Sequence, residues 1–161
     1  MAIYGGIDVG GTGALSLIEG KRVKVYDFED NDALNALIEI GDRVLINEAF
    51  VMVERQQAFH KQGAVSGFKL GVNYGLWRGR LEALSIPFAM VSAKQWQNYF
   101  FVDMPKRIAD KGTKKMSLYK ARSMYPEAAL RYMPLEKHHN RADSLLIATY
   151  CKLANEGVIS I

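Results

Sequence analysis

The chain has 161 residues, of which 49% are hydrophobic, so it is long enough for one well-filled core and short for two domains. The single cysteine, Cys151, excludes an internal disulfide, and with only three histidines it argues against a zinc site of cysteine and histidine ligands. No charged-then-apolar leader opens the sequence, and no uncharged run approaches the ~18 residues of a membrane span. We therefore expect a single domain over residues 1–161 in an intracellular protein without a membrane segment.

The net charge of +4 is unevenly distributed along the chain. Residues 1–50 carry 4 basic and 9 acidic side chains, whereas residues 94–137 carry 10 basic and 4 acidic ones. An acidic pole beside a basic surface is typical of a protein that holds metal near a polyanion, although ordinary solvated faces give the same pattern.

The first 28 residues predict three antiparallel strands joined by tight turns. Apolar and β-branched residues alternate from Ile3 to Phe28, with interruptions at Gly10–Gly13 and at residues 19–21. Asp8 lies inside the first strand, on the face opposite Ile7. Aspartate is rarely buried unpaired, so we interpret Asp8 either as a ligand of an ion or phosphate or as a cap of the glycine turn.

A helix that begins at Asn31 or Asp32 and ends at Gly41 is predicted next, followed by a covered central strand over residues 44–46. That strand leads into Asn47 and Glu48. Glu48 is then a second acid at the end of a buried strand, with a solvated strand terminus as the alternative.

Residues 54–84 predict a long helical region in which glycine occupies every fourth position from 63 to 79. Each interior glycine costs a helix about 0.8–1 kcal/mol relative to alanine. We expect the glycine ridge to allow close approach of the sheet or of a dimer partner, unless some of the glycines divide the region into two helices.

The remaining elements complete a mixed α/β sheet. We expect a strand over 86–91, a helix capped by Ser92, a loop over 101–113 and a lysine-rich helix over 114–125. The last helix runs from about 140 to 155, and Asp143 heads its apolar stripe, so it is expected to face the sheet. If Asn140 is the N-cap, Asp143 would instead serve the helix dipole at the third helical position.

Six segments, in this order, resemble RuvC-type Holliday junction resolvases of the ribonuclease H-like superfamily, phage and other viral members included. They are Gly6–Gly10, Ile46–Phe50, Gly67–Leu84, Val91–Trp96, Lys111–Lys120 and Arg141–Ala148. The resemblance implies a ribonuclease H-like α/β fold, with three antiparallel strands followed by parallel strands and flanking helices. It also implies a homodimeric, Mg²⁺-dependent crossover junction endodeoxyribonuclease that cuts four-way DNA junctions in the cytoplasm of a bacterial or virus-infected host cell.

By this resemblance Asp8, Glu48 and Asp143 are catalytic carboxylates that bind Mg²⁺, two ions in each site, for which Mn²⁺ would substitute. Oxygen ligands suit such hard cations, and a pair of them can activate water and stabilise the leaving oxygen. The family usually has a fourth acid, or a histidine, where this chain has Asn140. We expect Asn140 or His139 to complete the site, and a helix cap is the alternative for either.

The resemblance also indicates DNA contacts. Four lysines match the family's basic segment and would neutralise phosphates, and Lys114 or Lys115 would stabilise the charged transition state. A solvated helix face is the alternative for these lysines. Phe50 is the candidate for an aromatic wedge in the junction, with a core position as the alternative. The predicted DNA-binding residues are Phe50, Lys111, Lys114, Lys115 and Lys120.

Two other functions stay open on the sequence. Residues 8–13 also resemble the first phosphate motif of sugar kinases and actin-type ATPases, but no second such motif follows. A catalytically silent protein that binds branched DNA is the third possibility, because Asn140 stands where an acid is usual.

Overall fold

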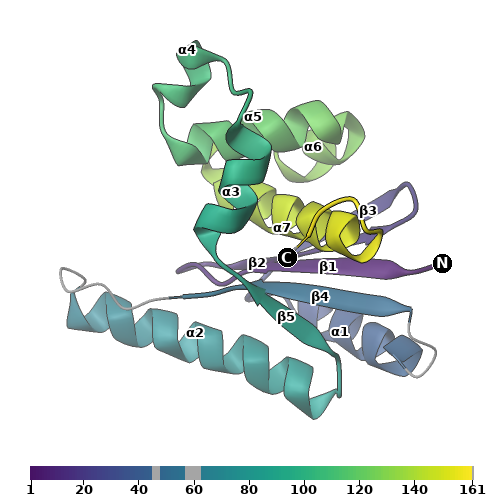
Figure 1. Cartoon of the computed structure of the whole chain (residues 1–161). Helices are drawn as coiled ribbons and strands as arrows, with labels where there is room; N and C mark the ends of the chain where they lie inside the picture. Colours follow the sequence, from purple (N-terminus) through teal and green to yellow (C-terminus); the bar gives the residue numbers. More distant parts are fainter. Residues whose placement is uncertain (45–47, 57–62, 161) are drawn as a thin grey trace.

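The computed structural model describes residues 1–44, 48–56 and 63–160, which form a five-stranded mixed sheet covered by helices on both faces (Figure 1). The order of the strands in the sheet is β3-β2-β1-β4-β5. The first three strands are antiparallel neighbours, and β4 and β5 run parallel to β1. The predicted fold class is therefore confirmed. The strands are β1 (Ile3–Asp8), β2 (Ala14–Glu19), β3 (Arg22–Asp27), β4 (Ala49–Glu54) and β5 (Phe88–Val91).

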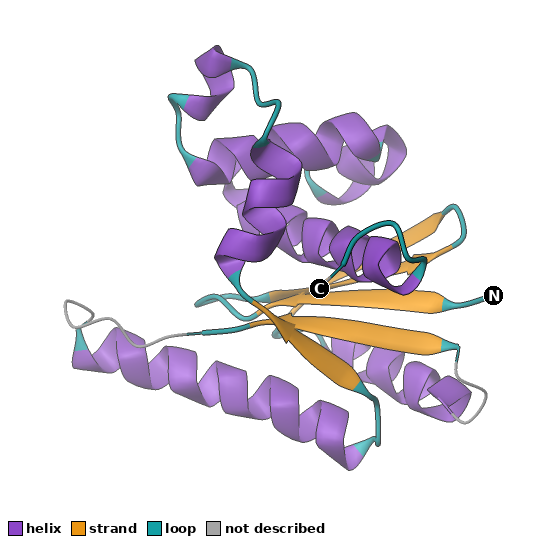
Figure 2. Cartoon of the chain, viewed as in Figure 1, coloured by secondary structure: helices purple, strands orange, loops and turns teal. Residues whose placement is uncertain are grey.

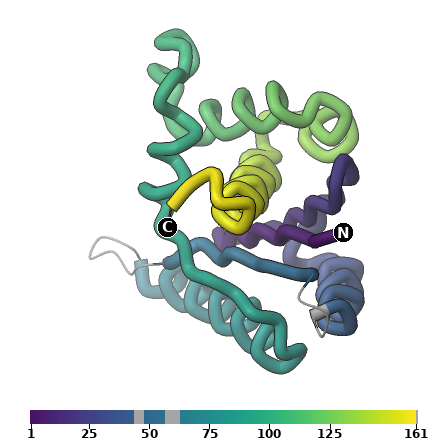
Figure 3. The backbone as a smooth tube through the Cα atoms, turned by 45° about the vertical axis from the view of Figure 1, so that its right-hand side comes forward, coloured from purple at the N-terminus to yellow at the C-terminus, as the bar shows by residue number. Residues whose placement is uncertain are grey.

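Helices form a layer on each face of the sheet (Figures 1 and 2). One layer consists of α1 (Asn31–Val44) and α2 (Ala64–Ala83). In the other layer, α7 (His139–Asn155) lies directly over β1 and β2, as the tube in Figure 3 shows, and further helices gather around it. These are α3 (Ala93–Phe101), α4 (Lys106–Ala109), α5 (Thr113–Met124), α6 (Pro126–Tyr132) and a short 3₁₀ turn, Glu136–His138.

Each layer encloses its own hydrophobic cluster. Trp77 and Leu81 of α2 fill the cluster on the α1 and α2 side, whereas Trp96 and Leu145 belong to the cluster under α7. Side chains of a strand alternate between these two clusters. A polar residue on a central strand must therefore lie in one layer or the other.

Several predicted boundaries differ from the structure. Gly41 does not end α1, which continues to Val44. Of the predicted strand over 44–46, Val44 ends α1 and the rest lies outside the described residues. The central strand is β4, so Glu54 ends a strand instead of beginning a helix. The expected loop over 101–113 contains α4, and α6 was not predicted.

The glycine ridge does not face the sheet. The buried side of α2 carries Asn73, Trp77 and Leu81. On the opposite side, a Cβ added at Gly71, Gly75 or Gly79 would meet no atom within 4 Å. The hypothesis that the ridge packs on the sheet is wrong, whereas a dimer partner stays a prediction. Large apolar side chains share this exposed face with the glycines: Val65, Phe68, Val72 and Leu76.

Within the described parts of the chain, no helix is long and apolar enough to cross a membrane.

Candidate active site

Two acids end neighbouring parallel strands. In the register between β1 and β4, Ile7 pairs with Val53, so Asp8 and Glu54 follow as the next pair. Ile7 and Val53 belong to the cluster on the α1 and α2 side. By alternation, Asp8 and Glu54 both point to the α7 side, at the same end of the sheet.

Helix α7 brings the third acid to this end. A Cβ on Gly6 would lie 2.1 Å from the Ala148 nitrogen and 2.3 Å from the Ser144 oxygen, so α7 approaches β1 only because residue 6 is glycine. The hydroxyls of Ser16 and Ser144 form a buried hydrogen bond of 2.7 Å in the same contact. The first turns of α7, with Asp143, therefore lie close to the end of β1.

Burial raises the pKa of all three carboxyl groups, and repulsion by a neighbouring acid adds to this for Glu54 and Asp143. Burial raises the pKa of Asp8 to about 6, although the Gly10 amide donates a hydrogen bond of 3.0 Å to it. Burial, and after it the charge of Asp8, raises the pKa of Glu54 to about 7. Burial, Asp8 and Glu54 raise the pKa of Asp143 well above its ordinary value. A bound cation would relieve this repulsion.

Glu54 is held by a neighbour from α3. The indole nitrogen of Trp96 donates to one carboxylate oxygen at 3.2 Å, and the Gln56 amide donates to the other at 3.4 Å. Ser92 caps α3, as predicted, and Trp96 is buried one turn later. The cap therefore also orients the indole toward the acid.

Helix α5 faces Asp143 from the other side. The Ser117 hydroxyl is buried without a hydrogen-bond partner of good geometry among the described residues, and its proximity opposes the rise in the pKa of Asp143. Lys114, one turn earlier, acts on this pKa in the same direction. Since Lys114 is exposed, its ammonium group is also free to meet an anion from solvent.

The other predicted lysines lie further from the acids or have partners. Lys115 forms an ion pair with Glu136, which lowers the pKa of Glu136. Lys111 is exposed just before α5, and Lys120 is half-buried in its second half.

His139 and Asn140 open α7, which begins at His139. Asn140 is therefore not the N-cap, and the cap interpretation of Asn140 and Asp143 is wrong. The Asn140 amide donates to the Thr12 hydroxyl, tying the start of α7 to the loop after Asp8. Burial, and then Lys114, lowers the pKa of His139.

Glu48 lies at the opposite end of β4 from the acids. Its backbone oxygen accepts a hydrogen bond of 2.6 Å from Ile3, and its carboxylate pairs with Arg43 at 3.3 Å. Six residues of extended chain, about 20 Å, separate it from Glu54. The expectation that Glu48 ends a strand beside Asp8 is wrong, because the strand starts after it.

Phe50 lies near the same far end. Its ring stacks on Tyr4 with the centroids 6.0 Å apart, against the cluster under α7. Phe50 therefore has a packing position, which was the alternative to its expected role as a wedge in the junction.

The sequence contains a pattern from which Glu54 could have been predicted as an acid at the end of a strand. β1 and β4 are both six-residue runs that end in an acid, IYGGID and AFVMVE. The apolar character continues from residue 44 to 53, apart from Asn47 and Glu48, so the local pattern allows a strand end at Glu48 or at Glu54. Pairing with β1 selects the second.

The three acids suit a hard divalent cation. Among residues 1–44, 48–56 and 63–160, no three His, Cys, Asp or Glu side chains converge into a ready-made metal site. Nevertheless, Asp8 is close enough to raise the pKa of Glu54, and both raise the pKa of Asp143; the three acids offer only oxygen donors. Oxygen donors of this kind suit Mg²⁺ or Mn²⁺ better than a soft cation.

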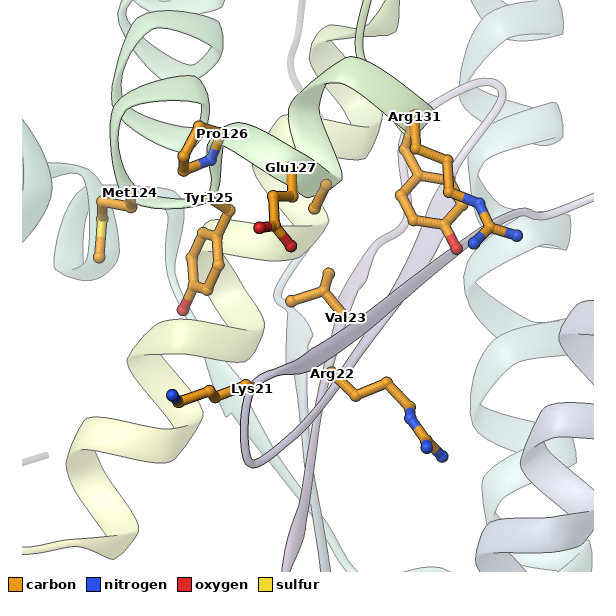
Figure 4. Close-up of a pocket in the computed structure, with 10 residues that line it drawn as sticks. Lys21, Arg22, Val23, Met124, Tyr125, Pro126, Glu127 and Arg131 are labelled. Carbon is orange, nitrogen blue, oxygen red and sulfur yellow. The ribbon is translucent and has the colours of Figure 1, made fainter.

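A cavity of about 440 Å³ lies away from these acids. It is lined by the turn after β2 and by the junction of α5 and α6, with Lys21, Arg22, Tyr125, Glu127 and Arg131 around it (Figure 4). This turn is at the end of the sheet opposite Asp8, because β2 runs antiparallel to β1.

A second cavity, of about 270 Å³, adjoins the start of α7. It is lined by Thr12, Asp27, Asn140 and Arg141 among others.

No protein-family model and no curated protein sequence matches the chain. Solved structures do match it. T. thermophilus RuvC in complex with a Holliday junction substrate aligns with a TM-score of 0.59 and 18% identity, over 98% of this chain and 97% of that chain. A second Thermus thermophilus RuvC structure aligns with a TM-score of 0.53 and 20% identity, over 96% of each chain. Over nearly its whole length, the chain therefore has the ribonuclease H-like fold of RuvC.

Proposed function

We propose that the chain is a divalent-metal-dependent endonuclease that resolves four-way DNA junctions, and other branched DNAs, by paired phosphodiester hydrolysis. The observation that carries this proposal is the meeting of Asp8, Glu54 and Asp143 at one end of a RuvC-like sheet. One structure with this fold is a RuvC in complex with a Holliday junction substrate. In this proposal Glu54 is the catalytic, metal-binding carboxylate, the role that the resemblance implied for Glu48.

Asp8, Glu54 and Asp143 would hold Mg²⁺ or Mn²⁺, and we expect two ions in each site. The bound ions would supply an activated water and stabilise the leaving oxygen. The carboxylates act in their ionised form, so their raised pKa values make binding of the cation compete with protons. His139 and the Asn140 oxygen are the further candidate ligands.

The basic segment supports the proposed DNA contacts. Lys114 projects from α5 near Asp143, where it suits the negative charge of a phosphate. The ion pair of Lys115 with Glu136 is partly exposed, and such pairs contribute only about 0–1 kcal/mol, so a phosphate can compete for the lysine. Lys111 lines a cavity together with Lys115, and Lys120 is a further candidate contact later in α5.

A homodimer through α2 is part of the proposal. Val65 and Phe68 are 84% and 77% exposed, and the glycines beside them leave open space for a second helix. Exposed apolar patches of this kind mark protein interfaces, and backbones approach closely where side chains are absent. Two copies would present two acidic sites, as paired cuts require.

Incubation of the purified protein with labelled four-way, flap and linear DNAs, with and without Mg²⁺, tests the function. We expect metal-dependent cleavage of the branched DNAs and none of linear duplex. Binding of the junction without cleavage would favour the silent junction-binding protein. Tight binding of ATP with no effect on DNA would favour the kinase or ATPase interpretation.

A further inference from the structure

The loop that follows Asp8 rests on the buried side of α2. Asn73 is only 6% exposed, and its amide nitrogen lies 3.4 Å from the Gly10 oxygen and 3.2 Å from the Gly11 oxygen. The Gly10 nitrogen donates in turn to the Asp8 carboxylate at 3.0 Å. A continuous chain of hydrogen bonds therefore leads from α2 through the loop to Asp8.

Trp77, one turn further along α2, meets the same loop without bonding to it. A Cβ on Gly13 would lie 3.4 Å from the indole nitrogen of Trp77, which is buried with no hydrogen-bond partner among the described residues. Gly13 has a φ of +54°, a conformation that side chains disfavour. On this helix, Asn73 therefore forms the hydrogen bonds to the loop, whereas Trp77 only packs against it.

We propose that Asn73 is a positioning residue for Asp8. Residues 10, 11 and 13 are glycines, so the loop has more backbone freedom than other sequences would allow. The Asn73 amide selects one conformation by satisfying two carbonyl groups, and this conformation turns the Gly10 N–H toward the carboxylate. Its importance for catalysis rests on the proposed function, whereas its effect on the loop does not.

The test compares Asn73→Leu, which removes the donor at similar volume, with Leu81→Val, which weakens the packing of the same helix without touching the loop. The first measurement is amide hydrogen exchange at Gly10–Gly13 in the metal-free protein. We expect exchange about tenfold faster in Asn73→Leu, as for the loss of an ordinary hydrogen bond. In Leu81→Val we expect the exchange rate at Gly10–Gly13 to be unchanged. Asn73→Ala replaces the Leu variant if that variant does not fold.

The second measurement is junction cleavage. We expect kcat to fall about ten- to a hundredfold in Asn73→Leu with KM unchanged, since small misplacements of catalytic groups cost this much. Unchanged exchange, unchanged kcat, or an equal fall of kcat in Leu81→Val would each overturn the proposal. If the wild-type protein cleaves no DNA, the proposed function fails, while the exchange measurement still decides whether Asn73 holds the loop.

Discussion

Glu54 and Glu48 carry the same side chain, but their surroundings differ. Glu54 is confined between Asp8 and Trp96, and its pKa is raised; Glu48 pairs with Arg43, and its pKa is lowered by that hydrogen bond. A carboxylate with a satisfied cationic partner has little need of a metal. An acid that lacks one and faces another acid is the better candidate ligand.

The first prediction separates these two glutamates. Glu54→Gln should lower the cleavage rate at least about a hundredfold and leave junction binding intact, because it removes a proposed metal ligand without removing a proposed DNA contact. Rates with labelled junctions and affinities from gel shifts measure both. Glu48→Gln is the matched control, since it makes the same change about 20 Å away. Loss of cleavage in Glu48→Gln but not in Glu54→Gln would reverse the assignment.

The second prediction concerns stability and pH. Because folding raises the pKa of Asp8 from 3.8 to about 6, the folded state holds a proton that the unfolded state releases between these values. The stability contributed by this group is therefore complete below about pH 4 and is lost as pH rises through 6, a difference on the order of 3 kcal/mol. The free energy of unfolding in urea, measured without metal from pH 4 to 8, should fall less in Asp8→Asn than in the wild type.

The comparison with Asp8→Asn is needed because the histidines change the free energy of unfolding with pH in the opposite direction. Burial lowers the pKa of His138 and His139, so their contribution to stability is complete above their unfolded pKa and is lost as the pH falls through the lowered value. Mg²⁺ should restore stability at pH 8 in the wild type only. A wild-type stability curve parallel to that of Asp8→Asn would contradict the raised pKa.

At the scale of elements, the contact of α7 with β1 determines whether Asp143 reaches Asp8. Gly6 provides the close approach, and the ion pair of Arg141 with Asp27 fastens the start of α7 to the end of β3 at 2.5 Å. Arg141 also donates to the Tyr132 oxygen, which adds α6 to this junction. The position of Asp143 therefore depends on contacts that other residues, Gly6 and Arg141, make.

The third prediction follows from Gly6. Gly6→Ala places a methyl group within 2.1 Å of a helix backbone, which must move, and such overpacking costs typically about 1–3 kcal/mol or more. Thermal unfolding should show a clear loss of stability, and the apparent affinity for Mn²⁺ should fall as Asp143 moves away. Gly11→Ala serves as the control, because a Cβ there meets nothing within 4 Å. Equal melting temperatures for Gly6→Ala and the wild type would contradict this account.

At the scale of the whole molecule, the two sides of α2 have different surroundings. Its buried side carries Asn73 and Trp77 under the loop of the candidate site, and its outer side carries the apolar residues and glycines. If a second copy docks on the outer side, the two acidic sites are linked through a single helix in each protomer.

The fourth prediction tests this outer side. Leu76→Asp should shift the protein from dimer to monomer in sedimentation or light scattering, because it places an unpaired charge in an apolar interface. Leu130→Asp, an equal change at an 81% exposed position on α6, should leave the mass unchanged. A monomeric wild-type protein at micromolar concentration, or a dimer that survives Leu76→Asp, would contradict an interface on α2.

Local sequence patterns determined much of the fold. Alternation of apolar residues placed Asp8 on one face of the first strand, and helical periodicity turned Asp143 toward the sheet; both follow from bonds and side-chain directions within one element. The first three strands are antiparallel neighbours, as predicted, because strands joined by tight turns have few alternatives.

Other features were decided only by contacts between elements. The apolar run from residue 44 to 53 is compatible with strand ends at Glu48 and at Glu54, and the register against β1 selects Glu54. A glycine at every fourth position defines one face of a helix but not whether that face meets the sheet or solvent. Sequence alone therefore determined which side chains share a face, whereas tertiary pairing decided which acids meet, because register and packing join residues that no local period relates.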